Sequence, residues 1–443
     1  MITRYSDRHC IARRLALAAT ICGAMSSAPA LATEGYFQNG ISVRNKGLAG
    51  AGAADPLSPL VLAQNPAGIV EIDTQLELGL SIFSPLRQFE GSGGPGFTPS
   101  GVVKSGRNFF FLPTVGYTRR LSENSAIGVA LYGNGGLNTA YGSPANPACA
   151  SPPLPAPNGV FCGGKTGVDL IQVFLSVGYS HKFGDAVSVG VAPVLAMQML
   201  KADGLQAFAF NQAGQPLTID PSNLSDNGYS TSTGYGARVG ILVKPIPQIR
   251  LAASYQTEMT MSRFKKYRGL FEGAGKFNIP SNYTLGIAVD PSPELTLMFD
   301  YRHINYEDVP AVSNSSSIPQ QFGSAGGPGF GWKNVDSYKF GAEWNASEAL
   351  TLRGGVSFNN NPVPSEDVTL NILAPGVSKQ HYTAGARLKT SERSAFDFSL
   401  LYSPNARTRG IEVTPAGPNP GHRIKLQMHQ FEAGLAWTLR FGR

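Results

Sequence analysis

Charged residues are scarce in this chain of 443 residues, making up 15% of it, while hydrophobic residues make up 42%. Disordered proteins combine high net charge with few hydrophobic residues, so this composition argues against disorder as the general state of the chain. Long hydrophobic runs are also missing: the longest, near residues 15–24, falls short of the roughly 18 apolar residues that a membrane-spanning helix needs. A bundle of transmembrane helices is therefore disfavoured, although the chain has enough apolar surface for a large folded unit.

Cysteine is scarce as well, with four in the whole chain. Cys10 and Cys22 fall in an N-terminal segment that is typical of an export signal. Several arginines are followed by an apolar stretch over residues 15–25 and then by Ala30-Leu31-Ala32, a small-residue cleavage site. We therefore predict a signal peptide over residues 1–32.

The two cysteines that remain after export are Cys149 and Cys162, in a proline-rich segment. An even pair in an exported chain favours one disulfide over a metal site or a catalytic thiol. Four arginines and Asp7 leave with the signal, so that 32 basic and 28 acidic residues remain. This small positive excess does not indicate a nucleic-acid partner, and no residue pattern predicts a metal or a cofactor.

From Asp73 onward, apolar residues alternate with polar or small ones over segments of about ten positions, which is the period of a β-strand with two unlike faces. In the last segment, Phe431, Leu435 and Trp437 share one face. The opposite faces of these segments carry charges of both signs, at Arg238, Glu258, Asp300, Arg302, Lys339, Glu343, Arg353, Arg387, Asp397, Glu432 and Arg440. An apolar face rimmed by aromatics and a charged opposite face indicate a barrel with lipid outside and a hydrated interior.

The connections between these segments alternate strictly in length. Six short turns fall at 122–124, 184–185, 245–248, 290–294, 345–348 and 390–393. Seven long loops fall near 87–106, 135–166, 202–227, 263–276, 307–333, 359–378 and 405–428. Together they join fourteen strands, so residues 73–443 are predicted to form an all-β, 14-stranded antiparallel transmembrane β-barrel in the outer membrane of a Gram-negative cell. A soluble β-sandwich or a propeller would leave the export signal and the loop alternation unexplained.

Residues 33–72 break the strand pattern and are dominated by small side chains. We predict that they form a small helical plug, or hatch, inside the barrel lumen. Three parts of this segment, Gly35-Tyr36-Phe37-Gln38, the Gly/Ala-rich run through Ala54, and the turn of Asn65, Pro66, Ala67 and Gly68, resemble the N-terminal hatch of the FadL family of outer-membrane long-chain fatty acid transporters, which includes TodX-type proteins. The resemblance covers the mature chain in length and strand count.

That resemblance implies that the turn of Asn65, Pro66, Ala67 and Gly68 gates the channel near an opening made by a kink in the third strand. Here this strand would be residues 126–134, followed by glycines, and Gly133, Asn134 and Gly135 are the candidate kink. A strand that simply ends in a glycine-rich loop would give the same residues. The family also implies a monomer, an outer groove on extracellular loops, and a tighter site beside the hatch.

A fatty acid needs an apolar slot for its chain and a cation for its carboxylate. Arg238, Arg302 and Arg387 are the candidate carboxylate ligands, since guanidinium pairs bidentately with carboxylates. Interior salt bridges to the barrel's own carboxylates would equally explain these arginines. Phe208 and Phe210 are candidates for an outer apolar groove, and self-packing of their loop is the alternative.

The predicted function is passive uptake of hydrophobic compounds, with long-chain fatty acids first and aromatic or other hydrocarbons second. A barrel enzyme such as a lipase or deacylase would need a nucleophile and a base, and neither His-Glu-x-x-His nor Gly-x-Ser-x-Gly occurs. A porin would need an open pore, against which the plug argues. Expected partners are the hydrophobic ligand, membrane lipid, the barrel assembly machinery, and lipopolysaccharide beside the basic cluster at residues 263–268.

Overall fold

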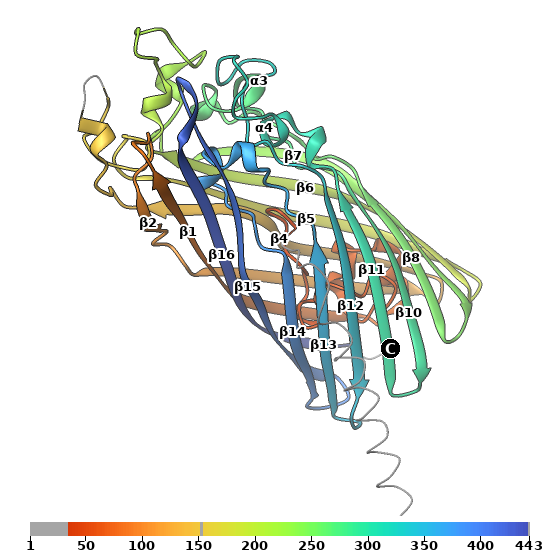
Figure 1. Cartoon of the computed structure of the whole chain (residues 1–443). Helices are drawn as coiled ribbons and strands as arrows, with labels where there is room; N and C mark the ends of the chain where they lie inside the picture. Colours follow the sequence, from red (N-terminus) through yellow and green to blue (C-terminus); the bar gives the residue numbers. More distant parts are fainter. Residues whose placement is uncertain (1–33, 151–153, 442–443) are drawn as a thin grey trace, which may run out of the picture.

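The computed structural model describes residues 34–150 and 154–441 as a closed β-barrel (Figure 1); the predicted signal peptide, residues 1–32, lies outside this part of the chain. Fourteen strands pair antiparallel around a ring, and pairing of the last strand with the first closes it. The predicted 14-stranded barrel is confirmed. The ring consists of β1 (Gln75–Gly93), β3 (Phe110–Ser122), β4 (Ser125–Tyr141), β5 (Thr166–Phe183), β6 (Val187–Asp203), β7 (Ser230–Ile246), β8 (Ile249–Gln256), β10 (Asn282–Ser292), β11 (Leu295–Ile304), β12 (Val335–Asn345), β13 (Leu350–Asn359), β14 (Gln380–Lys389), β15 (Ser394–Thr414) and β16 (Gly417–Arg440). Two short strands, β2 (Gly101–Lys104) and β9 (Thr260–Met261), pair with β1 and β7.

The barrel wall is apolar outside and charged inside. Leu80 and Leu400 are 47% and 64% exposed on the outer face, although they lie in the middle of long strands. The alternating inward positions hold buried charges such as Asp300, Lys339 and Asp397. Because successive strand residues point to opposite faces, this arrangement matches a wall whose outside is covered by lipid.

The two ends of the barrel differ. All six predicted short turns connect consecutive strands at one end, whereas the long connections gather at the other end, where α3 and α4 lie (Figure 1). No helix among the described residues is both long and apolar enough to cross a membrane. The helices are α2 (Val43–Lys46), α3 (Glu272–Gly275), α4 (Pro310–Ser313) and the 3-10 turns η1 (Pro59–Ala63), η2 (Pro66–Glu71), η3 (Pro147–Ala150), η4 (Gln206–Phe208), η5 (Pro221–Asn223), η6 (Lys265–Tyr267), η7 (Tyr306–Asp308), η8 (Ser365–Asp367) and η9 (Leu370–Ile372).

Two segments predicted as loops are largely strand. Residues 405–428 form the outer half of the β15–β16 hairpin, whose strands are joined at residues 414–417. Residues 87–93 likewise extend β1 and pair with β16 and β2. The loop predictions were wrong there because these parts lie beyond the outward-facing apolar band. Their outward residues are mostly polar, and the buried apolar residues, such as Phe89, Ile424 and Leu426, face inward instead.

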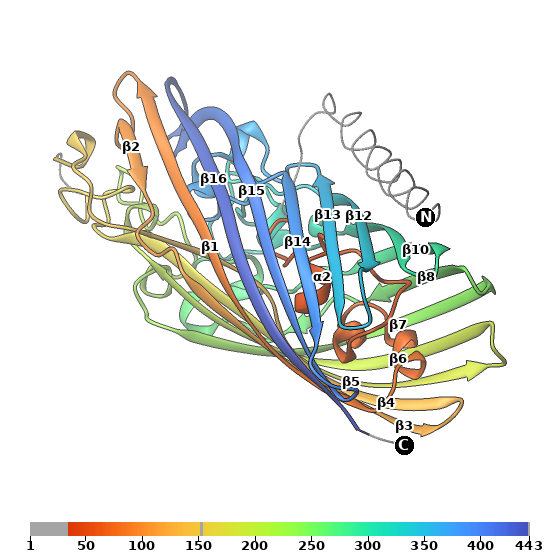
Figure 2. The same cartoon turned by 90° about the horizontal axis from the view of Figure 1, so that it is seen from below.

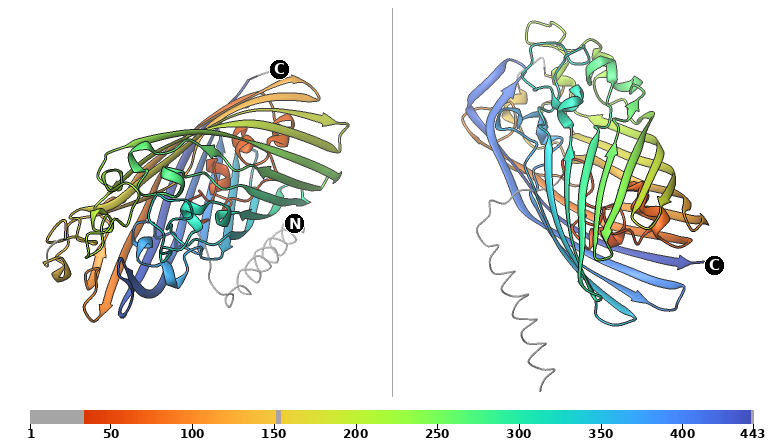
Figure 3. Two further views of the ribbon diagram at one scale, coloured as in Figure 1. Left: turned by 90° about the horizontal axis from the view of Figure 1, so that it is seen from above. Right: turned by 90° about the vertical axis from the view of Figure 1, so that its right-hand side faces the viewer.

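Residues 34–72, called the hatch below, lie inside the barrel; Figure 2 and Figure 3 place this segment, coloured red to orange, within the ring of strands. Its α2, η1 and η2 are buried almost throughout. Ion pairs attach it to the wall: Lys46 pairs with Glu432 of β16, and Arg44 lies 2.9 Å from Glu343 of β12. The hatch therefore has polar as well as apolar contacts with the lumen.

Candidate functional site

The barrel wall has an opening between β3 and β4. From their shared turn these strands pair, with one register shift between Arg120 and Ser122, up to Thr114 and Tyr132, and then they separate. They approach again near the loop end, where the amide of Gly106 donates to the carbonyl of Ala140 at 2.8 Å. The space between these two points, bordered by residues 109–113 and 133–139, is called the window below.

Gly133, Asn134 and Gly135, the predicted kink, form one edge of the window. The register of β4 against β5 shifts by one residue between Gly133 and Gly135, as in a β-bulge. The side-chain amide of Asn134 donates a hydrogen bond to the side-chain oxygen of Gln172 of β5, at 2.9 Å. The strand continues beyond this point, so it does not end in the glycine-rich stretch.

The first residues of the hatch lie at the window and replace part of the missing strand pairing. The amide of Gln38 donates to the carbonyl of Asn134 at 3.2 Å, and the amide of Gly136 donates to the carbonyl of Tyr36 at 3.0 Å. Phe37 forms an isolated β-bridge with Gly135. A Cβ atom on Gly135 would lie 1.8 Å from the Tyr36 carbonyl oxygen, so this close approach requires glycine.

A cavity of about 370 Å³, called the central cavity below, joins the hatch to the window. Its lining includes lumen residues such as Phe37 and Met428 and the window residues 109–112 and 135–138. Phe109 and Phe111 are 69% and 67% exposed on the outer surface. Because one cavity touches both buried lumen side chains and these exposed ones, it reaches from the lumen to the window.

Arg87 of β1 lines the central cavity and was missed in the sequence, because Pro85 ends the clear alternation and residue 87 was placed in a loop. Its side chain is 5% exposed. The guanidinium donates to the carbonyls of Asn138 and Arg107, while its Nε and both side-chain polar atoms of Asn138 are buried without a hydrogen-bond partner. No carboxylate of the described residues lies within ion-pair distance of Arg87.

Two of the three predicted carboxylate ligands, Arg238 and Arg302, line a smaller cavity of about 30 Å³ that borders the hatch at Phe37, Gln38 and Asn39. Arg302 forms an ion pair with Glu34 of the hatch at 2.7 Å. Arg238 is buried; it donates to the carbonyl of Gln64 at 3.3 Å and to the side chain of Gln256.

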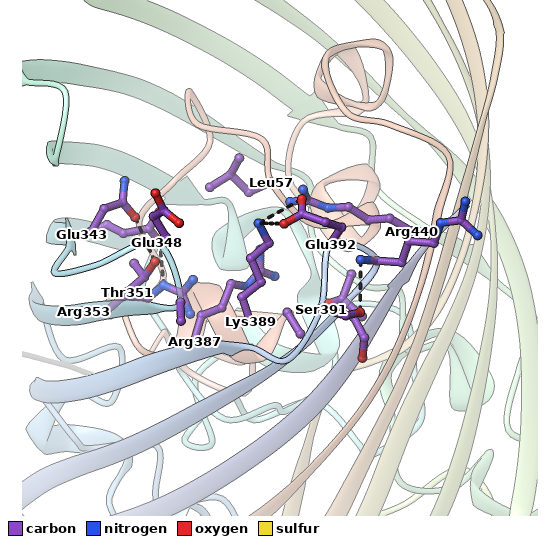
Figure 4. Close-up of a pocket in the computed structure, with 16 residues that line it drawn as sticks. Leu57, Glu343, Glu348, Thr351, Arg353, Arg387, Lys389, Ser391, Glu392 and Arg440 are labelled. Atoms are coloured by element: carbon purple, nitrogen blue, oxygen red, sulfur yellow. Dashed lines mark hydrogen bonds and ion pairs between the residues drawn. The ribbon is translucent and has the colours of Figure 1, made fainter. Parts of the chain in front are cut away.

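Arg387 lies apart from the other two predicted ligands, in a cavity of about 210 Å³ at the short-turn end of the barrel. It pairs with Asp397 at 2.7 Å, as the salt-bridge alternative expects. Figure 4 shows it in this cavity with Lys389, Glu392 and Leu57 of the hatch. The three arginines therefore do not form one carboxylate site.

Phe208, a candidate for the outer apolar groove, is 6% exposed and packs against Phe97, Phe161 and Phe322. These rings belong to three other loops, so Phe208 joins the loops to one another rather than packing within its own. Phe208 nevertheless borders a small apolar cavity of about 30 Å³ among the loops, called the outer cavity below. Phe210 is 51% exposed and does not line that cavity.

The turn of Asn65, Pro66, Ala67 and Gly68 lies away from the window, against β6 and β7. Asn65 caps η2 by accepting from the amide of Ala67 at 3.2 Å and donates to the carbonyl of Ile241 at 3.1 Å. The hatch residues at the wall opening are instead those of the Gly35–Gln38 motif. Among the loops, Cys149 and Cys162 form a disulfide.

Comparison with known proteins gives consistent matches over most of the chain. A family model described as outer membrane protein transport protein (OMPP1/FadL/TodX) matches residues 23–412. Outer membrane protein P1 of Haemophilus influenzae is 22% identical over 384 residues, 80% of each chain. An outer membrane protein of Neisseria meningitidis serogroup B is 25% identical over 117 residues, which is 25% of this chain and 24% of that protein.

Solved structures have the same fold. The crystal structure of the toluene transporter TodX of P. putida gives a TM-score of 0.67 at 17% identity, covering 91% of this chain and 99% of the other. A FadL homologue of Pseudomonas aeruginosa gives a TM-score of 0.65 at 14% identity, covering 92% and 100%. At these identities the likeness concerns the fold.

Proposed function

This chain belongs to the OMPP1/FadL/TodX family of outer-membrane transport proteins, and we propose that among hydrophobic compounds its substrates are long-chain fatty acids. The observation that carries this proposal is Arg87, a buried guanidinium without a carboxylate partner in an otherwise largely apolar cavity. A buried cation is costly unless it is paired, so a site of this kind favours a ligand that brings a negative charge. A fatty acid supplies a carboxylate together with a long apolar chain.

The apolar part of the ligand fits the central cavity. Burial of each methylene group is worth about 0.8 kcal/mol, so a chain with ten buried methylenes gains about 8 kcal/mol before the costs of binding. Phe37, Phe110, Leu112 and Leu137 line the cavity. The volume of about 370 Å³ lies within the range of about 300–1,000 Å³ usual for small-molecule sites.

The carboxylate would bind Arg87 through its unpaired Nε and the amide of Asn138, whose two polar atoms are both buried and unpaired. Charge-assisted hydrogen bonds of this type contribute about 1.5–3 kcal/mol each. Arg107 also lies near the Phe110 ring, 5.4 Å from its centroid, but its charge is taken up by Asp169. Arg87 is therefore a better candidate than Arg302 or Arg387, which pair with carboxylates, and than Arg238, which also lacks a carboxylate partner among the described residues but lines a cavity of only about 30 Å³.

Transport would proceed from the loops to the wall. The outer cavity beside Phe208 offers the first apolar contact, and the central cavity the second. Release requires only that Phe37 and Gln38 leave the edge of β4, which breaks a few backbone hydrogen bonds and opens the window toward the membrane. No step needs ATP, so the net flux would follow the concentration gradient.

Aromatic hydrocarbons are the second candidate, favoured by the phenylalanines at residues 109–111 and by the tyrosine and phenylalanine at positions 36 and 37 of the hatch. A structural neighbour is described as a toluene transporter. A cavity of about 150 Å³ is already enough for benzene, so the central cavity is larger than one such ring requires. A hydrocarbon would also leave Arg87 without a counter-charge.

The test compares binding of oleate, methyl oleate and toluene to the detergent-purified protein and its Arg87→Gln variant. Oleate should bind the variant about 10- to 100-fold more weakly, since about 1.4 kcal/mol corresponds to tenfold in affinity. Methyl oleate has no carboxylate and should bind both proteins alike, which separates lost recognition from a damaged cavity. Arg409→Gln, at an exposed position of β15, is the control. Tight toluene binding without measurable oleate binding would contradict the proposal.

A further inference from the structure

The loop end of the barrel carries a basic cleft that plays no part in the transport path described above. It is an open hollow of about 920 Å³ at the outer ends of β7 and β9. Four cations line it, and its lining includes no carboxylate; the full lining is Tyr229, Ser230, Thr231, Met261, Ser262, Arg263, Lys265, Lys266 and Lys276. The cleft combines a concentrated positive charge with an exposed aromatic ring, Tyr229.

The four cations lack counter-charges, unlike their neighbour. Arg268, only two residues after Lys266, forms an ion pair with Asp220 of an adjacent loop. No carboxylate of the described residues lies within ion-pair distance of Arg263, Lys265, Lys266 or Lys276. Like charges held close together repel each other, so the cleft favours an anionic occupant.

The position of the cleft relative to the membrane indicates which anion would occupy it. Tyr235, on the outer face of β7, is 67% exposed and is the type of aromatic that marks the membrane interface. Thr231 lies on the same face of β7, four residues closer to the loops. At about 3.3 Å per residue and a strand tilt near 40°, it lies about 10 Å above Tyr235, at the level of the lipid headgroups.

The paired backbone holds the cations against this outer face. The amide of Ser262 donates to the carbonyl of Thr233 at 2.8 Å, which continues the β7–β9 pairing up to Ser262, the residue before Arg263. The amide of Lys266 donates to the hydroxyl of Ser230 at 3.5 Å, and the Tyr267 hydroxyl donates to the carbonyl of Gly228 at 2.6 Å. The cleft is thus attached to the wall at its base.

We propose that this basic cleft binds the phosphate groups of lipopolysaccharide, the phosphorylated glycolipid of the outer leaflet. Its phosphates lie just above the acyl chains, at the level of Arg263 and the lysines. Cations beside an anionic membrane surface contribute about 1 kcal/mol each, which corresponds to about fivefold in affinity per residue. The proposal concerns a surface outside the central cavity and does not depend on the substrate.

The test uses the full-length protein in detergent with a chelator present, and measures binding of diphosphorylated lipid A by native mass spectrometry and by titration. Neutralising the cleft with Arg263→Gln, Lys265→Gln, Lys266→Gln and Lys276→Gln should weaken lipid A binding by at least about tenfold. Removing four exposed cations elsewhere on the outer half, with Lys104→Gln, Arg407→Gln, Arg409→Gln and Arg423→Gln, should weaken it much less. Arg268→Gln, which removes an already paired charge, should leave it nearly unchanged.

Two further measurements separate the possible ligands. Dephosphorylated lipid A should bind the native protein as weakly as diphosphorylated lipid A binds the cleft variant. Inorganic pyrophosphate should compete with lipid A only at far higher concentration, because it lacks the acyl chains that lie beside the wall. Equal loss of binding in both fourfold variants would overturn the proposal, since it would reduce the effect to net charge. Unchanged lipid A binding together with weakened oleate binding in the cleft variant would assign the cleft to substrate capture and would also overturn it.

Discussion

At the scale of single residues, Gly135 determines how closely the hatch can approach the wall. A Cβ atom there would lie 1.8 Å from the Tyr36 carbonyl oxygen, so Gly135→Ala should displace Tyr36 and Phe37 from β4. We expect the variant to show a higher ion conductance in planar bilayers, because the bridge at the window is lost. Gly142→Ala is the matched control, since a Cβ atom on Gly142 has no atom within 4 Å. Equal conductance of Gly135→Ala and the native protein would show that this contact does not close the window.

Buried and exposed ion pairs in this barrel should differ in their effect on stability. Asp397 is buried and pairs with both Arg353, at 2.5 Å, and Arg387. Asp397→Asn keeps the shape of the side chain but leaves Arg387 without its counter-charge, so the free energy of unfolding should fall by about 3 kcal/mol or more. The exposed pair of Glu392 with Lys389 provides the comparison. Glu392→Gln should change the free energy of unfolding by less than about 0.5 kcal/mol. Urea titration in detergent micelles measures both, and similar values would contradict this prediction.

Sequence patterns predicted which residues point inward but not how they pair. The strand period is two, so the alternation within each strand is enough to assign Asp300, Lys339 and Asp397 to the lumen. Pairing depends on which chain segment lies opposite, and for Arg302 that segment is the hatch, through Glu34. The role of Arg87 also depends on other parts of the chain. Arg87 belongs to β1, but the cavity that it lines exists because β3 and β4 separate.

At the scale of elements, Glu412 attaches the outer hairpin of β15 and β16 to the loop between β1 and β2. It is fully buried and accepts hydrogen bonds from the amides of Phe97, at 2.9 Å, and Thr98, at 2.6 Å. Glu412→Ala leaves both amides without this partner, so residues 94–100 should become more sensitive to limited proteolysis while the barrel stays folded. Glu366→Ala, at an exposed position of η8, is the control. An unchanged cleavage pattern would mean that other contacts hold the loop.

The lengths of the elements were less predictable than their faces. Inside the membrane, lipid on one side and water on the other produce alternation, and the six short turns follow from it. Beyond the membrane the outer side is wet, so the outward residues of 405–428 are mostly polar although the segment pairs as strands, and buried apolar residues such as Ile424 and Leu426 face inward. The hatch motifs predicted a plug, but they did not predict where the turn at Asn65 would lie. Its place at β6 and β7 depends on close packing of Asn65 against Gly240, and so on the shape of the lumen.

At the scale of the whole molecule, the barrel is a channel whose bore is filled by its own N-terminal segment. Arg44 of the hatch binds Asp55, also of the hatch, and Glu343 of β12, and Lys46 binds Glu432 of β16, so α2 is tied to distant parts of the wall. The tip of the hatch is held at the window by backbone hydrogen bonds of Tyr36 and Gln38, and Glu34 just before it pairs with Arg302 and Lys339. A small motion of Phe37 and Gln38, between the anchors at Glu34 and α2, can therefore open the window while both anchors stay in place.

This division of the hatch predicts three different conductances. The native protein should conduct small ions poorly, whereas a variant lacking residues 34–72 should conduct like a porin. Removing the two cations of α2, with Arg44→Gln and Lys46→Gln, leaves Glu432 without its cation and should give transient openings of intermediate size. Neutralising two exposed cations, with Lys165→Gln and Arg409→Gln, should leave the conductance at the native level. Porin-like conductance of the native protein would contradict a plugged channel, and a silent double variant would show that apolar packing alone holds α2.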